Sequence, residues 1–286
     1  MKRMQLESRW VLVTGASSGL GREIATQLAR DHRANLILVA RRQSRLEELQ
    51  QELESEYGVQ VRVQPADLSD LDQVERLFEV CTRECNIYAV VLDAGVTFFG
   101  RQQNLAWDEF QRMLATNVNS VVRLVNRFVP YLLSRNDGGG LLIVSSLAGI
   151  IPLPYQAAYS GTKAFLTNFG LALAYELRHE NLSITVFAPG GIATEMLDKS
   201  GLREKFADSP FTQSVTVCAR SAIRAMQRRR RLAVPGVLNK IAATAARCVP
   251  RIALTALVGR AYQRALEAKP RSVVPSPNSS SFGPSS

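Results

Sequence analysis

The chain has 286 residues, of which 46% are hydrophobic, and a formal net charge of +10. This length allows one large α/β domain with a sizeable core. The four cysteines are too few and too scattered for a disulfide framework, and the first residues enter a strand-like run without the apolar stretch of a secretory signal. We therefore expect a cytoplasmic protein built around a single domain.

The first half of the chain alternates between two sequence patterns. Short, largely apolar runs bounded by turn residues begin near residues 10, 34, 59 and 88, and they predict strands that are covered on both faces. The segments 21–32, 43–58 and 71–85 carry apolar residues at helical spacing. This strand and helix alternation predicts an α/β fold with a doubly wound parallel sheet.

The second half continues the same alternation. A helical segment is expected from about residue 107 to 134, followed by a strand at 141–146, a helix containing Tyr159 and Lys163, and a strand at 183–191. We expect residues 1–228 to form the domain, with a substrate loop at about 195–210. A basic helical extension is expected at 229–269, followed by a disordered tail at 270–286, which is rich in Ser and Pro.

A glycine-rich stretch, TGASSGLG, follows the first predicted strand and opens the first predicted helix. Gly15, Gly19 and Gly21 are the positions at which a side chain would block the approach of a pyrophosphate to the backbone N–H groups. Glycines are also common in ordinary tight turns. Their place between a strand and a helix nevertheless favours a dinucleotide site.

Together with the later YSGTK, this stretch resembles the short-chain dehydrogenase/reductase family, with matching motif order from about Arg9 to Met196. The resemblance implies a Rossmann-type domain, a nicotinamide cofactor and an active site centred on Tyr159 and Lys163. It also implies a dimer or tetramer. The cofactor-binding positions expected from the motifs are Gly15, Ser17, Ser18, Gly19, Leu20, Gly21, Arg41, Arg42, Asp67, Leu68, Ala94, Gly95, Tyr159, Lys163, Pro189, Gly190, Ile192 and Thr194.

Two arginines, Arg41 and Arg42, stand where NAD-selective domains carry an acid at the end of the second strand. Guanidinium groups at this position would pair with a 2′-phosphate, and Ser17 could add a hydroxyl donor. A solvated charge pair at a helix start is the alternative, although it would oppose the helix dipole. The sequence therefore predicts NADP(H) as the cofactor.

The residues after the third and fourth predicted strands agree only in part with the family pattern. Asp67 matches the position whose carboxylate meets the adenine amino group, and it could equally serve as a helix N-cap. Leu92 and Asp93 stand where the family usually has two asparagines, whereas Ala94 and Gly95 keep the close backbone approach to the cofactor. An acid in place of an amide changes the hydrogen bonding at this edge of the sheet.

The reduction of a carbonyl by hydride transfer needs a proton donor and groups that stabilise the developing charge. Lys163, one helical turn after Tyr159, supplies a cation that we expect to lower the pKa of the tyrosine toward neutrality. By resemblance, Ser146 holds the substrate carbonyl, Asn117 bends its helix and supports a proton relay, and Lys163 also binds the nicotinamide ribose. The predicted catalytic set is Asn117, Ser146, Tyr159 and Lys163.

The expected substrate is a hydrophobic ketone or 3-oxoacyl compound, reduced to an alcohol. The loop at 195–210 carries Met196, Leu197, Leu202 and Phe206, and the aromatic residues Phe98, Phe99 and Tyr155 could add to an apolar lining. A cofactor-binding regulatory protein without turnover is the alternative function, and the complete catalytic set argues against it. No metal is expected, because neither histidine lies near Cys81 and Cys85 in sequence.

The positive charge is concentrated near the C-terminus. Residues 219–271 contain thirteen Lys or Arg and one acid, Glu267, with two helix-like stretches broken at Pro250. No apolar run reaches the roughly 18 residues needed to span a bilayer. Such basic amphipathic helices fit peripheral attachment to anionic lipid, or a lid or subunit contact with solvated arginines. Nucleic-acid binding is not expected, because Tyr262 is the only aromatic residue there and no recognition motif is present.

Overall fold

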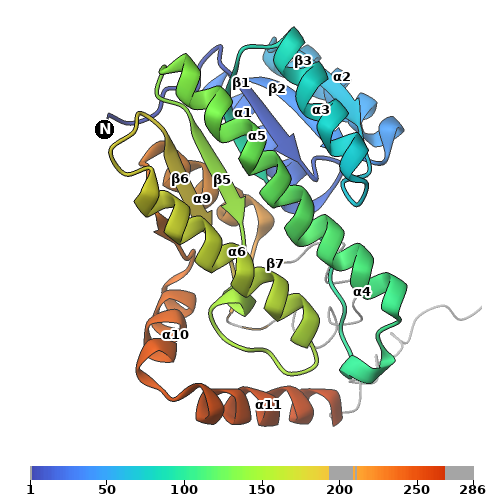
Figure 1. The fold of residues 1–286 in the computed structure, drawn as a ribbon, viewed down its shortest axis with the longest axis vertical. Helices are drawn as coiled ribbons and strands as arrows, with labels where there is room; N and C mark the ends of the chain where they lie inside the picture. The colour runs from blue at the N-terminus through green and yellow to red at the C-terminus, as the bar shows by residue number, and fades with distance from the viewer. Residues whose placement is uncertain (1, 193–208, 210, 268–286) are drawn as a thin grey trace, which may run out of the picture.

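The computed structural model describes residues 2–192, 209 and 211–267. A parallel sheet of seven strands forms the centre of the described part (Figure 1). Its strands are β1 (Trp10–Thr14), β2 (Asn35–Ala40), β3 (Val61–Pro65), β4 (Ile87–Leu92), β5 (Gly140–Val144), β6 (Ser183–Phe187) and β9 (Leu232–Ala233). The strand order is β3-β2-β1-β4-β5-β6-β9. From β1 the chain adds strands on one side as far as β3 and then on the other side from β4 onward. Doubly wound sheets bind their ligands at this switch point between β1 and β4.

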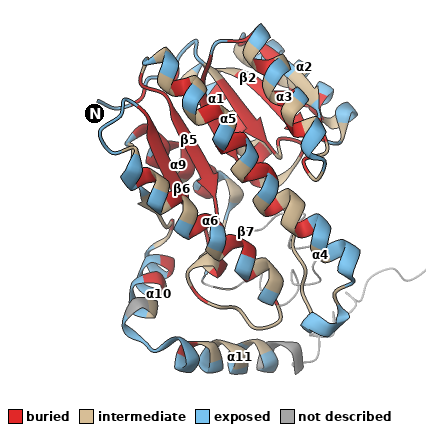
Figure 2. Ribbon diagram, viewed as in Figure 1, coloured by how far each residue is buried: buried red, intermediate tan, exposed pale blue. Residues whose placement is uncertain are grey.

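Helices cover both faces of this sheet. The first face packs against α1 (Gly19–His32), α2 (Gln43–Tyr57) and α9 (Val215–Gln227), and the second against α3 (Leu71–Glu84), α5 (Ser120–Arg135) and α6 (Ala157–Glu176). Figure 2 shows the buried residues concentrated on the strands and on the inner sides of these helices. The doubly wound, Rossmann-type fold predicted from the sequence is confirmed.

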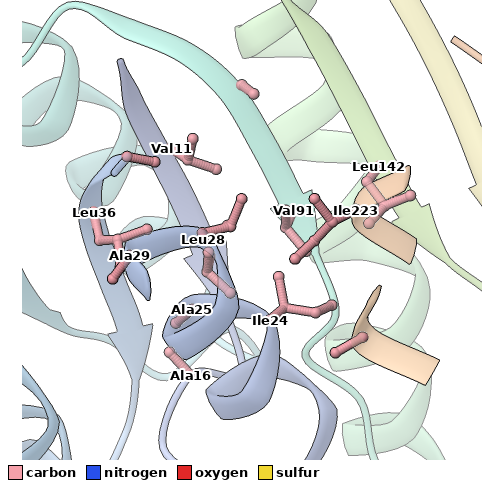
Figure 3. Packing of buried hydrophobic residues seen from close by; sticks show 14 of the residues in the cluster. Val11, Ala16, Ile24, Ala25, Leu28, Ala29, Leu36, Val91, Leu142 and Ile223 are labelled. Carbon is pink, nitrogen blue, oxygen red and sulfur yellow. The ribbon is translucent and has the colours of Figure 1, made fainter. Parts of the chain in front are cut away.

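The core explains why the strands are nearly continuous apolar runs. Each residue of β4 is buried, because the strand has helices above and below it. On the first face, Ile24 and Leu28 of α1 pack close to Val91 of β4 and Ile223 of α9 (Figure 3). Full burial of one such side chain stabilises the fold by about 1.5–3 kcal/mol, so this packing holds α1 firmly below the glycine-rich turn.

The remaining elements lie near the carboxyl ends of the strands or beyond them. A short parallel pair joins β7 (Gly191–Ile192) to β8 (Thr212–Gln213). Helix α4 (Trp107–Leu114) leads through a π-helical turn at Ala115–Asn119 into α5, and short 3-10 turns cover Gln102–Asn104 and Leu147–Gly149. Helices α10 (Val237–Cys248) and α11 (Arg251–Glu267) follow β9 and lie at one end of the molecule (Figure 1).

The structure differs from the sequence prediction at the expected boundary near residue 228. Strand β9 lies within the segment expected to be helical, and Leu232 and Ala233 pair with Val186 and Phe187 of β6. Two residues are too short a run to show a strand pattern, which is why the sequence did not predict β9. The break at Pro250 is confirmed by the junction of α10 and α11. Among the described helices, none is both long and apolar enough to cross a membrane.

Candidate active site

The turn after β1 has the backbone geometry that a pyrophosphate needs. Gly15 and Gly19 have φ values of +75° and +58°, which favour glycine. A Cβ atom on Gly21 would lie 2.6 Å from the carbonyl oxygen of Gly15, so only glycine lets α1 begin this close to the turn. Leu20 is buried and anchors the first helical turn. The N-terminus of α1 is thus a preformed anion site at the carboxyl end of β1.

Arg42 reaches back from the end of β2 to this turn. Its Nη2 atom donates hydrogen bonds to the hydroxyls of Ser17 at 3.1 Å and Ser18 at 2.9 Å. The Nη1 atom of Arg41 lies 3.9 Å from a carboxylate oxygen of Asp67. One guanidinium group and two hydroxyls therefore border the turn, with Arg41 next to Arg42 in the chain, and this donor set fits a 2′-phosphate.

Asp67 follows β3, and its side chain is fixed locally. The carboxylate accepts hydrogen bonds from the backbone N–H and the hydroxyl of Ser69 at 2.9 and 2.8 Å. Burial raises the pKa of Asp67, but these bonds and the Arg41 charge outweigh it, and the net pKa is lowered. The N-cap of α3 is Asp70 rather than Asp67, which leaves Asp67 at the position expected for adenine recognition. Leu68 beside it is buried.

Asp93 lies at the centre of the site, between the phosphate turn and the catalytic helix. Its carboxylate accepts a hydrogen bond from the backbone N–H of Gly21. Burial raises its pKa to about 6, and the charge of Lys163 opposes this shift. The hydroxyl of Thr14 accepts the N–H groups of Asp93 and Ala94 at 3.0 and 3.1 Å and so fixes the turn after β4. The sequence singled out Asp93 only as a departure from the family pattern.

Asn117 lies in the π-helical turn between α4 and α5 and is completely buried. Its Oδ1 accepts the N–H of Val96 at 2.8 Å, and its Nδ2 donates to the carbonyl of Val96 at 2.9 Å and to Thr162 at 3.1 Å. A Cβ atom on Gly95 would lie 3.3 Å from Asn117 Oδ1 and 3.5 Å from Lys163 Nζ. Asn117 thus joins the strand end after β4 to the catalytic helix.

Tyr159 and Ser146 meet at the carboxyl end of β5. Burial raises the pKa of Tyr159 to about 12, although a hydrogen bond with the Ser146 side chain lowers it. The expectation that Lys163 lowers this pKa toward neutrality is therefore not met in the protein alone, because burial has the larger effect. At this pKa the phenol keeps its proton at neutral pH, as a proton donor must. Ser145 points away and bonds the Lys163 carbonyl and Thr167.

Lys163 is 4% exposed, and its Nζ atom donates to the Val144 carbonyl at 2.9 Å. The same atom lies 5.8 Å from the centre of the Tyr159 ring. Burial lowers its pKa to about 8, and the charge of Asp93 opposes this shift. The cation is therefore held one helical turn from Tyr159, with Asp93 as its acidic neighbour.

The Pro-Gly segment after β6 is packed between β5 and the C-terminal helices. The Pro189 carbonyl accepts the N–H of Leu147 at 2.6 Å. A Cβ atom on Gly190 would lie 2.6 Å from the side chain of Asn239 in α10, a buried residue. Ile192 is held in β7 against Gln213. The first helix of the extension therefore supports the segment expected to contact the nicotinamide, whereas Thr194 lies outside the described residues.

Tyr262 of α11 belongs to the site, and the sequence did not place it there. Its ring centre lies 6.2 Å from that of Phe99, which lies 6.3 Å from the ring of Tyr155. Its proximity also raises the pKa of Tyr159. The only available signal was a single aromatic residue on an otherwise basic amphipathic helix. The expected substrate-loop residues Met196, Leu197, Leu202 and Phe206 lie outside the described residues.

The predicted positions that the structure describes thus gather along the carboxyl ends of β1 to β6, together with α6 and the turn that holds Asn117. The glycine cradle, the arginine and serine donors, and the close approach at Gly95 fit a dinucleotide with a 2′-phosphate. Within the described ranges, no group of His, Cys, Asp and Glu side chains could hold a metal ion. The site fits a nicotinamide-dependent oxidoreductase, and it brings a tyrosine, a serine, a lysine and an asparagine together near the carboxyl edge of the sheet.

Comparison with known proteins places the chain in a family. Residues 9–205 match the family model described as short chain dehydrogenase. The chain is 30% identical over 186 residues to a 7beta-hydroxysteroid dehydrogenase of Clostridium sardiniense, covering 65% of this chain and 70% of that protein. It is 33% identical over 193 residues to an NADP-dependent 3-hydroxy acid dehydrogenase of Schizosaccharomyces pombe, covering 67% and 74%. The protein belongs to the short-chain dehydrogenase family and is an NAD(P)-dependent oxidoreductase.

Solved structures share the fold over most of the chain. A short-chain dehydrogenase of Sphingobium yanoikuyae in complex with NADPH gives a TM-score of 0.76 at 24% identity, over 91% of this chain and 96% of that chain. The L-sorbose reductase of Gluconobacter frateurii, complexed with NADPH and L-sorbose, gives 0.71 at 25% identity, over 81% and 97%. The architecture is therefore that of the family's catalytic domain.

Proposed function

We propose that the protein is an NADPH-dependent reductase that converts a hydrophobic ketone or 3-oxoacyl compound to an alcohol, with Tyr159 as general acid. The observation that carries this proposal is that Tyr159 and Ser146 come together at the carboxyl end of β5, beside the buried Lys163. A proton donor, a second hydroxyl and a cation converge there at the carboxyl edge of the sheet, where a carbonyl can be polarised and protonated.

The cofactor is NADP(H). Arg42 with Ser17 and Ser18 supplies donors for the 2′-phosphate, and Arg41 adds a second cation. The yeast 3-hydroxy acid dehydrogenase is named as NADP-dependent, and the L-sorbose reductase structure contains NADPH. The turn at Gly15–Gly21 would hold the pyrophosphate, Asp67 the adenine, and Gly190 and Ile192 the carboxamide end.

In the proposed reaction, a nicotinamide held by Gly190, Ile192 and Lys163 would supply a hydride to the carbonyl carbon. Ser146 donates a hydrogen bond to the carbonyl oxygen and orients it toward the phenol. Tyr159 then gives its proton to the oxygen as negative charge develops, which yields the alcohol and a phenolate. Lys163 stabilises that phenolate as an ammonium held by the Val144 carbonyl, until a proton from solvent restores the phenol.

The substrate class is supported by relatives and by the described aromatic residues. A very-long-chain 3-oxoacyl-CoA reductase of Neurospora crassa is 32% identical over 205 residues, covering 68% of this chain and 60% of that protein. Phe99, Tyr155 and Tyr262 form an aromatic wall next to Tyr159. Such a wall suits an apolar substrate body better than a sugar or a small polar ketone.

A scan of purified full-length protein against ketones and 3-oxoacyl thioesters, with NADPH and then NADH, tests the proposal. Turnover of at least one hydrophobic carbonyl compound, faster with NADPH, is the expected result. Tight NADPH binding without turnover on any of them would instead favour a regulatory protein that keeps the fold but not the reaction. The intact catalytic set argues against that second function, because a binding protein has no need of a proton donor.

Peripheral attachment to anionic membranes is a further part of the proposal. Helices α10 and α11 expose Val237, Ile241, Ile252 and Leu257, with Ile252 88% exposed. Residues 219–271 contain a single acidic residue, Glu267, beside thirteen Lys or Arg. The exposed apolar side chains therefore lie on a strongly cationic segment. Co-sedimentation with phosphatidylserine vesicles is expected for the native chain and lost in an Ile241→Asp, Ile252→Asp variant. Equal sedimentation of both proteins would contradict this attachment.

We also propose that the protein forms a homo-oligomer through α6. This helix exposes Phe165 and Tyr175, at 45% and 57%, on the side away from the sheet, and Phe165 stacks on Phe169 at 5.8 Å. Exposed aromatic residues are enriched at protein interfaces. Light scattering should give a dimer or tetramer mass that falls in a Phe165→Glu variant, and a native monomer would overturn the proposal.

A further inference from the structure

A shallow groove with a largely apolar floor and two arginines at its edges lies where the C-terminal helix meets the loops around the catalytic helix. It has a volume of about 470 Å³ and lies between α11, the turn at Gln102–Asn104 and the loop before α6. Two arginines, Arg101 and Arg260, face it from opposite walls, together with Gln103 and Gln263. Among the described residues that line the groove, none is acidic.

The walls of the groove are tied to one another. The N–H of Gly100 donates to the Tyr155 carbonyl at 2.8 Å, which links the two loops. On the other wall, a Cβ atom on Gly259 would lie 3.2 Å from Pro154, so α11 packs closely on the loop before α6. Tyr155 has a φ of 65°, a conformation that costs a non-glycine residue energy and that persists at functional sites. The groove is thus built by tertiary contacts and not left by loosely packed loops.

The groove adjoins the reaction centre through aromatic side chains. Tyr155 lines the groove and also contacts Phe99, and Phe99 contacts Tyr262. Tyr262 in turn lies close enough to Tyr159 to raise its pKa. One helix, α11, therefore presents Tyr262 toward the catalytic tyrosine and Arg260 toward the groove. An elongated apolar molecule with its carbonyl at Tyr159 would cross the aromatic side chains and end at the arginines.

We propose that this groove binds an anionic group at the far end of the substrate, so that the enzyme prefers apolar carbonyl compounds that end in a carboxylate or phosphate. The inference rests on the proposed function and deepens it by naming the substrate class. Arg101 and Arg260 are the specificity-determining residues, because paired guanidinium groups bind oxyanions through charge-assisted hydrogen bonds.

The charges around the groove support an anion over a neutral group. Neither Arg101 nor Arg260 pairs with an acid among the residues that the structure describes, so both guanidinium groups can bind an anion in the groove. The amide of Gln103 beside them can donate a further hydrogen bond to the same oxyanion. A neutral substrate end would leave both cations without a partner and gain little from the groove.

Matched substrate pairs test the proposal directly. A medium-chain ketone ending in a carboxylate is compared with its methyl ester, and a 3-oxoacyl thioester of coenzyme A with the same thioester of a short neutral thiol. The native enzyme should have a KM about tenfold lower for one or both anionic members. A preference within the first pair identifies a carboxylate, and one within the second pair identifies a phosphate. Equal KM values within both pairs would overturn the proposal.

An Arg101→Gln, Arg260→Gln variant separates recognition from structure. Its KM for the anionic substrate should rise about tenfold or more, whereas kcat and the KM of the neutral partner stay unchanged. The control is Arg251→Gln, which alters an exposed arginine of α11 that does not line the groove. Equal losses on both members of a pair, or the same effect from the control, would overturn the assignment.

A binding experiment covers the case in which no carbonyl compound is reduced, which would remove the proposed function. Calorimetric titration of the native protein with decanoate and with inorganic phosphate, in the presence of NADP⁺, should then show binding of one probe that weakens about tenfold in the double variant. Such a result would retain the groove as an oxyanion site. Absence of binding by both probes, or equal binding to both proteins, would overturn it.

Discussion

The cofactor side and the substrate side of the site are assembled in different ways. Short contiguous segments at the ends of neighbouring strands form the cofactor side, with Gly15 and Gly21 in one turn and Arg42 one strand away. Phe99, Tyr155 and Tyr262 form the described substrate wall, and they come from three distant parts of the chain. On the proposed function, local sequence therefore encodes the cofactor side, whereas tertiary packing assembles the side that selects the substrate.

The largest effect should come from the residue that both sides share. A Lys163→Met variant removes the cation beside Tyr159 and the hydrogen bond to Val144. We expect kcat to fall about 10³-fold with every substrate, since both charge stabilisation and proton transfer suffer. Steady-state kinetics beside Lys240→Met, an exposed lysine of α10, measure this. A loss confined to some substrates would mean that Lys163 belongs to the substrate side alone.

A change on the cofactor side should alter the choice of cofactor and nothing else. An Arg42→Ala variant loses the donors that meet Ser17 and Ser18, and its KM for NADPH should rise about 10–100-fold while that for NADH stays constant. Arg83→Ala, an exposed arginine in the last turn of α3, is the matched control. An unchanged preference for NADPH in the Arg42 variant would refute the assigned role.

A change on the substrate side should leave the cofactor unaffected. A Tyr262→Ala variant removes part of the aromatic wall, so the KM of an apolar ketone should rise about tenfold, as expected for losing contact with one ring. The KM for NADPH should not move. Tyr57→Ala, which alters a partly buried tyrosine at the end of α2, serves for comparison. If NADPH binding weakened as much as ketone binding, α11 would be a general support and the contrast between the two sides would fail.

The smallest effect should be a shift in the pH dependence of turnover when Asp93 is replaced. This carboxylate raises the pKa of Lys163, which is about 8 in the native site. An Asp93→Asn variant should therefore lose turnover at a pH about one unit lower as Lys163 becomes neutral. Tyr159 and Cys218 are the other titratable groups influenced by Asp93. An identical alkaline limb in both pH profiles would remove Asp93 from this role.

The same variant gives a stability prediction with a definite sign. The pKa of Asp93 is about 6 in the folded protein against an ordinary value of 3.8, so the folded state binds the proton more tightly. The free energy of unfolding should therefore fall as the pH rises from about 4 to about 6. Denaturant titrations across this range should show a smaller fall for Asp93→Asn. A parallel fall in both proteins would place its cause elsewhere.

The sequence was sufficient for much of the fold because each element has a period of its own. The six longer strands and the helices between them followed from apolar runs and helical spacing, and Pro250 separated α10 from α11. Strand β9 was missed because two residues cannot show a pattern. Its pairing with β6 depends on where the chain returns after α9.

The site was predictable where its residues follow strand ends. Parallel strands bring Gly15, Ala94, Ser146 and Pro189 to the same edge, so their proximity follows from topology alone. The pKa of a buried side chain does not follow from topology, because it depends on how burial and neighbouring charges offset each other. The sequence predicted a lowered pKa for Tyr159 from the adjacent lysine, whereas burial raises it to about 12. The roles of Gly15, Ala94, Ser146, Tyr159 and Pro189 in cofactor binding and catalysis remain predictions.

Long-range packing accounts for what the sequence left open. Helix α11 packs closely where Gly259 meets Pro154, and α10 packs closely where Asn239 meets Gly190. Each contact joins residues far apart in the sequence, so no local pattern indicates it. From its charge and helical spacing, the extension is predicted to be a peripheral membrane attachment, or a lid or subunit contact. The structure adds that its helices border the reaction centre, which makes substrate selection their proposed role.

The central claim is that Tyr159 donates the proton in a reduction that uses NADPH. The most direct measurement compares native protein with a Tyr159→Phe variant, recording NADPH affinity by fluorescence and single-turnover reduction of a hydrophobic ketone. We predict that NADPH binds both proteins equally well, while the variant reduces the ketone about 10²–10⁴-fold more slowly. Near-native reduction by Tyr159→Phe would contradict the account.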